Sequence, residues 1–134
     1  MANPNIVQVS TINGRSMGYQ LLTSNAQMIP PETALTGGVP ADQVYKINSI
    51  TVSNITTGTT AWVSVYRSTG GVAGPYGTSS VSGYLAYQID VPPKTSLSIL
   101  GKSTSIYLNE SHKISAVASA ASTLVFHASF EVIS

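Results

Sequence analysis

The two histidines are the side chains most able to take part in chemistry. His112 follows a short polar stretch that includes Glu110, and His127 lies shortly before Glu131. Both histidines with one of these glutamates could in principle hold a zinc ion. They do not form the i, i+2 or i, i+4 pair that would place two imidazoles together on one element, and the chain has no cysteine. We therefore predict that the protein holds no metal and needs no cofactor.

Motifs for nucleophilic catalysis or phosphate binding are also scarce. Serine is common, yet no Gly-x-Ser-x-Gly sequence is present to expose a nucleophile on a sharp turn. The glycine-rich stretch 70–74 lacks the Gly-Lys-Ser/Thr ending of a P-loop. The acidic residues form no obvious pair for glycoside hydrolysis. We predict no enzymatic activity; the open alternative is a cleft that joins His112 or His127 to a carboxylate and a serine.

The low charge of the chain limits its partners. Only 8% of the 134 residues are charged, the net charge is +1, and the basic residues are scattered. Ordinary domains contain about 25% charged residues. Without a basic cluster we expect no binding to nucleic acid or to a membrane surface. A nearly uncharged surface favours a protein that is covered by other proteins, although abundant Ser and Thr could also solvate it.

The N-terminus and the hydropathy argue against export or membrane insertion. The first residues lack the basic and apolar regions of a signal peptide. The longest apolar runs are a few residues, far short of the ~20 needed to span a bilayer. We expect synthesis in a cytoplasm and no membrane span.

Alternating patterns predict strands along the chain, and no window has a helical period. Segment 81–91 is the clearest case, with an inward face of Val81, Gly83, Leu85, Tyr87, Ile89 and Val91. Segment 123–133 has the same pattern, with Leu124, Phe126, Ala128, Phe130 and Val132 facing inward. Segment 61–67 carries large groups on both faces. Segment 44–54 changes phase, which predicts a bulge near Asn48 and Ser49.

Shorter strands and tight turns complete the expected fold. The shorter strands are 5–12, 15–22, 96–100, 105–108 and 112–118. Asn13-Gly14 predicts a type I′ hairpin turn, because both residues tolerate positive φ. Segments 55–60 and 109–111 are expected to be further hairpin connections. About eight short antiparallel strands predict an all-β, single-domain β-sandwich over residues 1–134, jelly-roll-like in topology.

Three segments are expected to contact a partner. They are an N-terminal arm (1–5) and two long loops (30–43 and 68–80) that are rich in Gly and Pro. Tyr76, on the glycine-rich loop, is the type of residue that anchors an interface, although it could equally fold back on its own sheet. The predicted contact residues are Ala2, Asn3, Pro4, Asn5, Leu35, Val39, Val72 and Tyr76.

Several stretches resemble a known group of proteins. They are 2–7, 11–15, 44–54, 91–97 and 106–110, and the likeness that they carry extends over most of the chain. In strand and turn pattern they resemble small virion structural proteins of tailed phages, especially cyanophages. Loop 68–80 is longer than the family pattern, which leaves open whether it faces a shell or solvent.

The resemblance implies a non-enzymatic capsid decoration, or cement, protein. Such a protein would bind the outside of the shell at joints between major capsid protein subunits and stabilise it. It would be a trimer or a dimer, made in the host cytoplasm and found on the virion. Two alternatives remain open. One is a tail, neck or fibre-attachment component. The other is a receptor- or carbohydrate-binding module of a tail fibre, for which Trp62 and Tyr66 are the pair of aromatic residues that could stack on a sugar.

Overall fold

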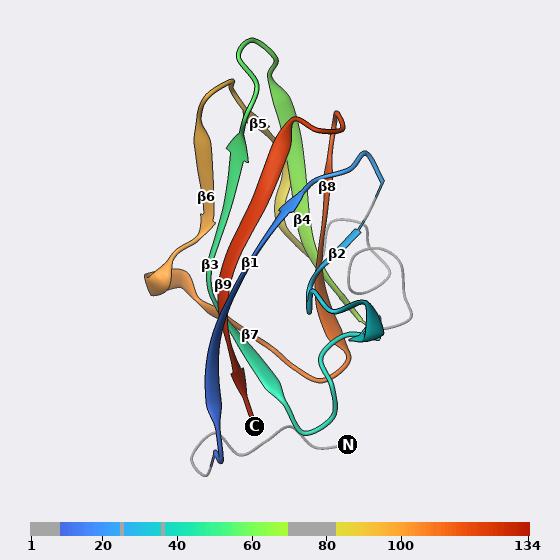
Figure 1. The fold of residues 1–134 in the computed structure, drawn as a ribbon, viewed down its shortest axis with the longest axis vertical. Coiled ribbons are helices and arrows are strands. Elements are labelled where there is room, and N and C mark those ends of the chain that lie inside the picture. The colour runs from blue at the N-terminus through green and yellow to red at the C-terminus, as the bar shows by residue number, and fades with distance from the viewer. Residues whose placement is uncertain (1–8, 25, 36, 70–82) are drawn as a thin grey trace.

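The computed structural model describes residues 9–24, 26–35, 37–69 and 83–134, which form nine antiparallel strands in two sheets (Figure 1). The first sheet has the order β1 (Ile12–Gln20), β9 (Leu124–Ile133), β3 (Val44–Asn54) and β6 (Ser96–Leu100), and β7 (Ile106–Leu108) also pairs with β3. The second sheet has the order β2 (Ala26–Ile29), β8 (His112–Ala118), β4 (Ala61–Thr69) and β5 (Tyr84–Val91). The predicted all-β sandwich is confirmed.

Two single-turn 3-10 helices interrupt the connections. They are η2 (Thr33–Leu35), between β2 and β3, and η3 (Lys102–Thr104), between β6 and β7. Neither these nor any other helix in the described part of the chain is long and apolar enough to cross a membrane. The helix η3 divides one edge of the first sheet into β6 and β7, so that more strands are found than the eight or so predicted.

The core lies between the sheets, and β9 supplies much of it. Its alternate residues Leu124, Phe126, Ala128 and Phe130 are completely buried, as predicted from the sequence. From the opposite sheet Val63 and Val65 of β4 and Ile114 and Ala116 of β8 meet them. This burial of apolar surface is the main source of stability for a sandwich of this kind.

The predicted bulge in β3 is confirmed. Ile47 pairs with Phe130, but Ser49 pairs with the next residue of β9, Ser129, so Asn48 is an extra residue in the ladder. Ile47 and Ile50 are therefore both fully buried although they are an odd number of residues apart. The amide of Asn48 donates to Glu131 Oε2 at 2.9 Å, which ties the bulge to β9.

The predicted hairpin turn at Asn13-Gly14 is wrong. Both residues lie inside β1, where they pair with Val132 and Glu131 of β9. The nine-residue strand β1 replaces the two strands expected at 5–12 and 15–22; residues 5–8 lie outside the described residues. Pairing along all of β1 outweighs the local preference of Asn-Gly for a turn.

The connections 55–60 and 109–111 are not hairpins either. The first joins β3 to β4, and the second joins β7 to β8. In each case the two strands belong to different sheets, so the chain crosses the sandwich at these points. Short connections of this length can thus join strands of opposite sheets as well as neighbouring strands of a hairpin.

Strand β5 departs from the simple alternation predicted for 81–91. Its pairing with β4 shifts register twice, and Gln88 has a positive φ of 46°. The rings of Tyr84 and Tyr87 consequently meet edge to face, with centroids 4.8 Å apart, although the sequence pattern assigned them to opposite faces. Residues 81 and 82 lie outside the described residues.

Candidate functional site

The two sides of the sandwich, where edge strands of different sheets face each other, are the candidate binding surfaces. We call them the β1–β2 flank and the β5–β6 flank after the strands that border them. Each flank contains hollows lined by residues of both sheets. In the part of the chain that the structure describes, no further strand pairs with the outer edges of these four strands, which end the two sheets.

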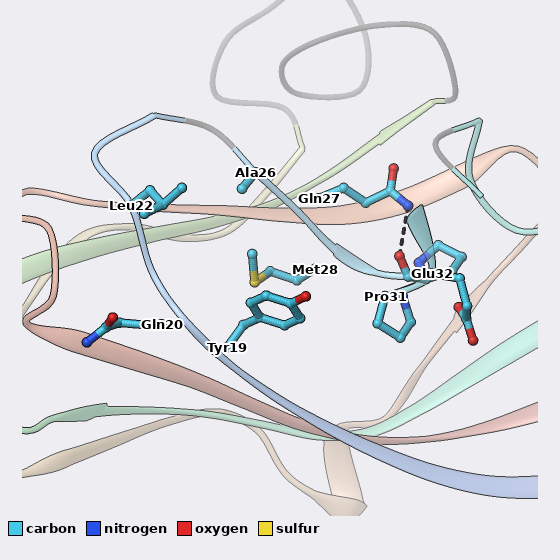
Figure 2. Close-up of a pocket in the computed structure, with 9 residues that line it drawn as sticks. Tyr19, Gln20, Leu22, Ala26, Gln27, Met28, Pro31 and Glu32 are labelled. Atoms are coloured by element: carbon cyan, nitrogen blue, oxygen red, sulfur yellow. Dashed lines mark hydrogen bonds between the residues drawn. The ribbon is translucent and has the colours of Figure 1, made fainter. Parts of the chain in front are cut away.

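The β1–β2 flank contains a hollow of about 240 Å³. Tyr19 and Met28 point into the space between the strands, and Leu22 and Ala26 lie near its other side (Figure 2). Gln27 fixes one wall, since its Nε2 donates to the carbonyl oxygens of Pro30 at 2.8 Å and Leu35 at 2.9 Å. The hollow is therefore mostly apolar, with a rigid rim at the start of the 30–43 connection.

An ion pair joins β1 to Glu32, one of the residues that line this hollow. Arg15 pairs with Glu32, and the Arg15 guanidinium carbon lies 5.6 Å from the centroid of the Phe130 ring. Phe130 in turn stacks on Tyr45, with centroids 5.4 Å apart. Burial, and then the nearby Glu32 carboxylate, raise the pKa of Tyr45, and Arg15 partly opposes them. Arg15 is thus paired within its own chain although its side chain is still 39% exposed.

The β5–β6 flank contains two hollows that share Leu85. One, of about 190 Å³, is lined by Arg67, Gly83, Tyr84, Leu85 and Ile106. The other, of about 210 Å³, is lined by Leu85, Ala86, Ile89, Leu97, Ser98 and Ile99. Leu85, Leu97, Ile99 and Ile106 are only partly buried against the core.

The irregular backbone of β5 explains why this flank is open. Ile89 pairs with the core residue Val63 and so faces inward, yet 41% of its surface is exposed. The extra residues at the two register shifts bend β5, and Gln88 N donates to Ser64 Oγ of β4 at 2.9 Å across this bend. The side chains that should seal the sandwich are therefore reachable from solvent.

The two histidines belong to different sheets. His127 of β9 is exposed, and it pairs with Gly18 on one side and Thr51 on the other. His112, at the start of β8, is partly buried; burial, and then the positive charge of Arg67, lower its pKa. Within the described residues, no three His, Cys, Asp or Glu side chains are grouped so that they could hold a metal ion.

The aromatic pair proposed for sugar stacking is not available as a pair. Trp62 is partly exposed, but only 1% of Tyr66 is exposed. Tyr84 packs edge to face on Tyr66, with centroids 5.5 Å apart. A buried ring cannot stack on a ligand from solvent, so the expectation for Trp62 with Tyr66 is wrong.

The described contact residues predicted from the sequence are Leu35 and Val39. Leu35 ends η2 and is partly buried. Val39 is a core residue, 3% exposed, and its backbone exchanges hydrogen bonds with the β7–β8 connection at His112 and Ser111. Little of Val39 is left for a partner. Ala2, Asn3, Pro4, Asn5, Val72 and Tyr76 lie outside the described residues.

Gly38 shows why this part of the 30–43 connection is held so closely. Its φ is +99°, and a Cβ at this position would lie 2.6 Å from the carbonyl carbon of Ser111. Only glycine allows the chain to approach the β7–β8 connection in this way. The first predicted loop is therefore partly a structural element of the sandwich.

Sequence reasoning missed the β5–β6 flank as a site. Its residues alternate like core residues, and alternation does not reveal whether an edge strand is covered. The feature of the sequence that comes nearest to indicating this flank is the low charge of its two edge strands. Asp90 is the one charged residue of β5, and β6 has none.

Comparison with known proteins gave no match: no family model, no curated protein and no solved structure is similar to this chain.

Proposed function

We propose that the chain is a non-enzymatic structural protein that binds other proteins, with the β5–β6 flank as a principal contact surface. The observation that supports this is the pair of apolar hollows that share Leu85. A partner that inserted apolar side chains there would complete a half-exposed part of the core. Burial of this kind contributes about 25 cal/mol for each Å² of apolar surface removed from water.

We propose further that this protein is a component of a phage virion and that its partner is the major capsid protein. The sequence resemblance to small virion proteins supports this step. The scarcity of charge also supports it, because a surface with few charges is suited to contact with other proteins. Many copies that each bind weakly at subunit joints would stabilise a shell together through multivalency.

We also propose that the sandwich is a jelly roll. The strand orders β1-β9-β3-β6 and β2-β8-β4-β5 fit the two four-stranded sheets of that fold if β6 and β7 are counted as one interrupted strand. The crossings at 55–60 and 109–111 agree with this topology. Jelly rolls are common among viral capsid proteins, so the topology and the proposed role are compatible.

The test is to mix the purified protein with empty shells and with tails of the phage that encodes it, and to image both by cryo-electron microscopy. Regular density at capsid subunit joints is the expected result. Density on tails alone would instead favour a tail, neck or fibre-attachment component. The absence of density on both would reject the virion role.

A matched pair of variants tests the flank. Ile89→Asp places a charge in the second hollow and should abolish shell binding, since Ile89 is a lining residue. Ile55→Asp is the control, because Ile55 is 56% exposed in the β3–β4 connection, away from the hollows. Equal binding by both variants would show that the β5–β6 flank is not the contact surface.

A further inference from the structure

The free edge of β1 differs from the other edges of the two sheets. An unpaired strand edge can add a strand from another chain, and proteins prevent this with short strands, bulges or charges. Strands β2 and β7 are short, and register shifts interrupt the pairing of β2, β5 and β6 with their neighbours. Of the edge strands that the structure describes, β1 alone is nine residues long and pairs with its neighbour without any shift.

The free edge of β1 also carries little charge. Arg15 is the one charged residue of the strand; its side chain is 39% exposed, but it is paired with Glu32 and lies over the Phe130 ring. Apart from Met17, every residue of β1 is exposed. The edge is therefore accessible and regular, and it has no unpaired charge, which are three properties that favour strand addition.

Hydrogen bonds at its two ends show which backbone groups of β1 point outward. Thr11 and Ser134 donate to each other's carbonyl oxygens at 3.1 Å, and Leu21 N donates to Leu124 O at 2.9 Å. In an antiparallel ladder, residues bonded to one neighbour alternate with residues whose groups point away from it. Odd-numbered residues of β1 are thus bonded to β9. The even-numbered residues direct their N–H and C=O groups to the open edge: Ile12, Gly14, Ser16, Gly18 and Gln20.

These outward groups match a second copy of themselves. A two-fold axis at Ser16 brings Gly14 opposite Gly18 and Ile12 opposite Gln20 of the other copy, so that each outward-facing residue meets another. Over the full strand this register forms about ten backbone hydrogen bonds. The residues nearest the axis on the outer face are Gly14, Ser16 and Gly18, which are too small to clash. Arg15 would lie opposite Met17 rather than opposite another arginine, so no like charges meet directly.

We propose that two copies of the chain pair through β1, antiparallel and centred on Ser16, to join their first sheets into one continuous sheet. The partner for this edge is a second copy because the register that uses every outward group is self-complementary. This deepens the proposed function by naming one partner of the structural subunit, and it leaves the β5–β6 flank free for a different one.

Single-cysteine variants test the register, because the natural chain contains no cysteine. In the proposed pair the Cα atoms of the two Ser16 residues are about 5.5 Å apart, within the range of about 4.4–6.8 Å for a disulfide. Ser16→Cys should therefore form a covalent dimer under a mild oxidant such as oxidised glutathione. The two Gly18 residues would be about 13 Å apart, so Gly18→Cys alone should not cross-link.

A mixture supplies the matched control. Gly14→Cys and Gly18→Cys should each stay monomeric on a denaturing gel, whereas the two mixed before oxidation should cross-link. Both sites tolerate a side chain, because a Cβ at Gly14 meets nothing within 4 Å and one at Gly18 makes only ordinary contacts, with His127 Cδ2 at 3.6 Å and Phe126 O at 4.0 Å. Efficient cross-linking of Gly18→Cys with itself, or none by Ser16→Cys, would overturn the register.

Light scattering of the unmodified protein gives an independent measurement. The expected mass is twice the 13.9 kDa of the chain. Ser16→Lys puts two cations at the axis and should weaken dimerisation about tenfold or more. Ser96→Lys, on the exposed edge strand β6 of the same sheet and outside the hollows, should leave it unchanged. A monomer that still decorates shells would refute the dimer and leave the proposed function standing; a dimer that binds no virion part would do the reverse.

Discussion

Asn54 is a single buried side chain that links the two sheets. It ends β3, is 3% exposed, and its Nδ2 donates to the carbonyl oxygens of Val91 on β5 and Thr59, both at 2.8 Å. Its Oδ1 accepts from the backbone N and the hydroxyl of Thr56, at 2.9 and 2.6 Å. One amide therefore makes four hydrogen bonds at this crossing.

Replacement of Asn54 should be among the more damaging changes in the protein. Asn54→Ala removes the buried hydrogen bond to the Val91 carbonyl and the acceptor of the Thr56 backbone N–H, and we expect it to lower the free energy of unfolding by about 3 kcal/mol. Asn54→Asp should cost at least as much, because a carboxylate would face those carbonyls. Urea unfolding curves measure both, with Asn109→Ala at an exposed position as control. A loss below that of the control would contradict the linking role.

His112 should make stability depend on pH. Its pKa is lowered in the folded protein from the ordinary value of 6.5, by burial and then by Arg67. Below that ordinary value the unfolded chain binds more protons than the folded one, so stability is complete above pH 6.5 and falls as the pH drops through it. Thermal unfolding followed from pH 8 to pH 5 should therefore show a decline in the melting temperature.

Two variants test whether His112 causes this decline in the melting temperature. His112→Gln cannot be protonated and should flatten the part of the pH profile below 6.5. His127→Gln, at an exposed position of β9, is the control for the loss of an imidazole elsewhere in the chain. A decline that survives in His112→Gln would assign it to other groups.

At the scale of elements, the bulge in β3 allows a deletion test. Removing Asn48 would leave Ile47, Ser49 and Ile50 in regular alternation, so every inward side chain of β3 would stay inward. We expect this deletion to fold and to cost only about 1 kcal/mol, roughly the value of the lost hydrogen bond to Glu131. Asn48→Ala removes only that bond and should give a similar loss in thermal or urea unfolding.

Deletion of Thr51 is the contrasting case. It would bring Ile50 and Val52 together in sequence, so one of these completely buried side chains would turn to the outside. We expect no cooperative unfolding transition in this variant. If both deletions behaved alike, the bulge would not be what sets the phase of β3.

Several strands were predicted with nearly the correct bounds. The predicted ranges 44–54, 96–100 and 112–118 coincide with β3, β6 and β8, and 123–133 agrees with β9 to within one residue. The four-residue strand β2 was missed because it is too short to show a period. The turn predicted at Asn13-Gly14 was wrong because these residues pair with β9. The local sequence does not show that such a partner strand exists.

The candidate site was predictable only in outline. The deficit of charge led to the prediction of protein contacts, but it does not say where on the surface they would lie. Leu85 and Ile89 look like ordinary core residues in sequence, and their exposure follows from two register shifts in β5 that no pattern in 81–91 reveals. Tyr66 shows the opposite error, since a ring on the outer face of a strand is buried beneath another ring.

At the scale of the whole molecule, the low charge predicts how its associations respond to salt. With six basic and five acidic residues in 134, little of any interface can be ionic. Raising sodium chloride from about 0.05 M to about 0.5 M should change the dissociation constant of shell binding, or of the β1 dimer, less than about twofold. Ammonium sulfate should strengthen both, because it favours burial of apolar surface. Sedimentation or light scattering in each salt measures the effect, and a tenfold loss in sodium chloride would contradict an apolar interface.

The hydrogen bonds between Thr11 and Ser134 have a mechanical consequence. Because β1 and β9 are antiparallel neighbours that meet at this end, tension applied at these two residues would open their ladder one bond at a time, like a zip. A ladder that opens one bond at a time resists little force. If copies of this chain reinforce a pressurised shell, the force must therefore act on the sides of the sandwich, where many hydrogen bonds share it.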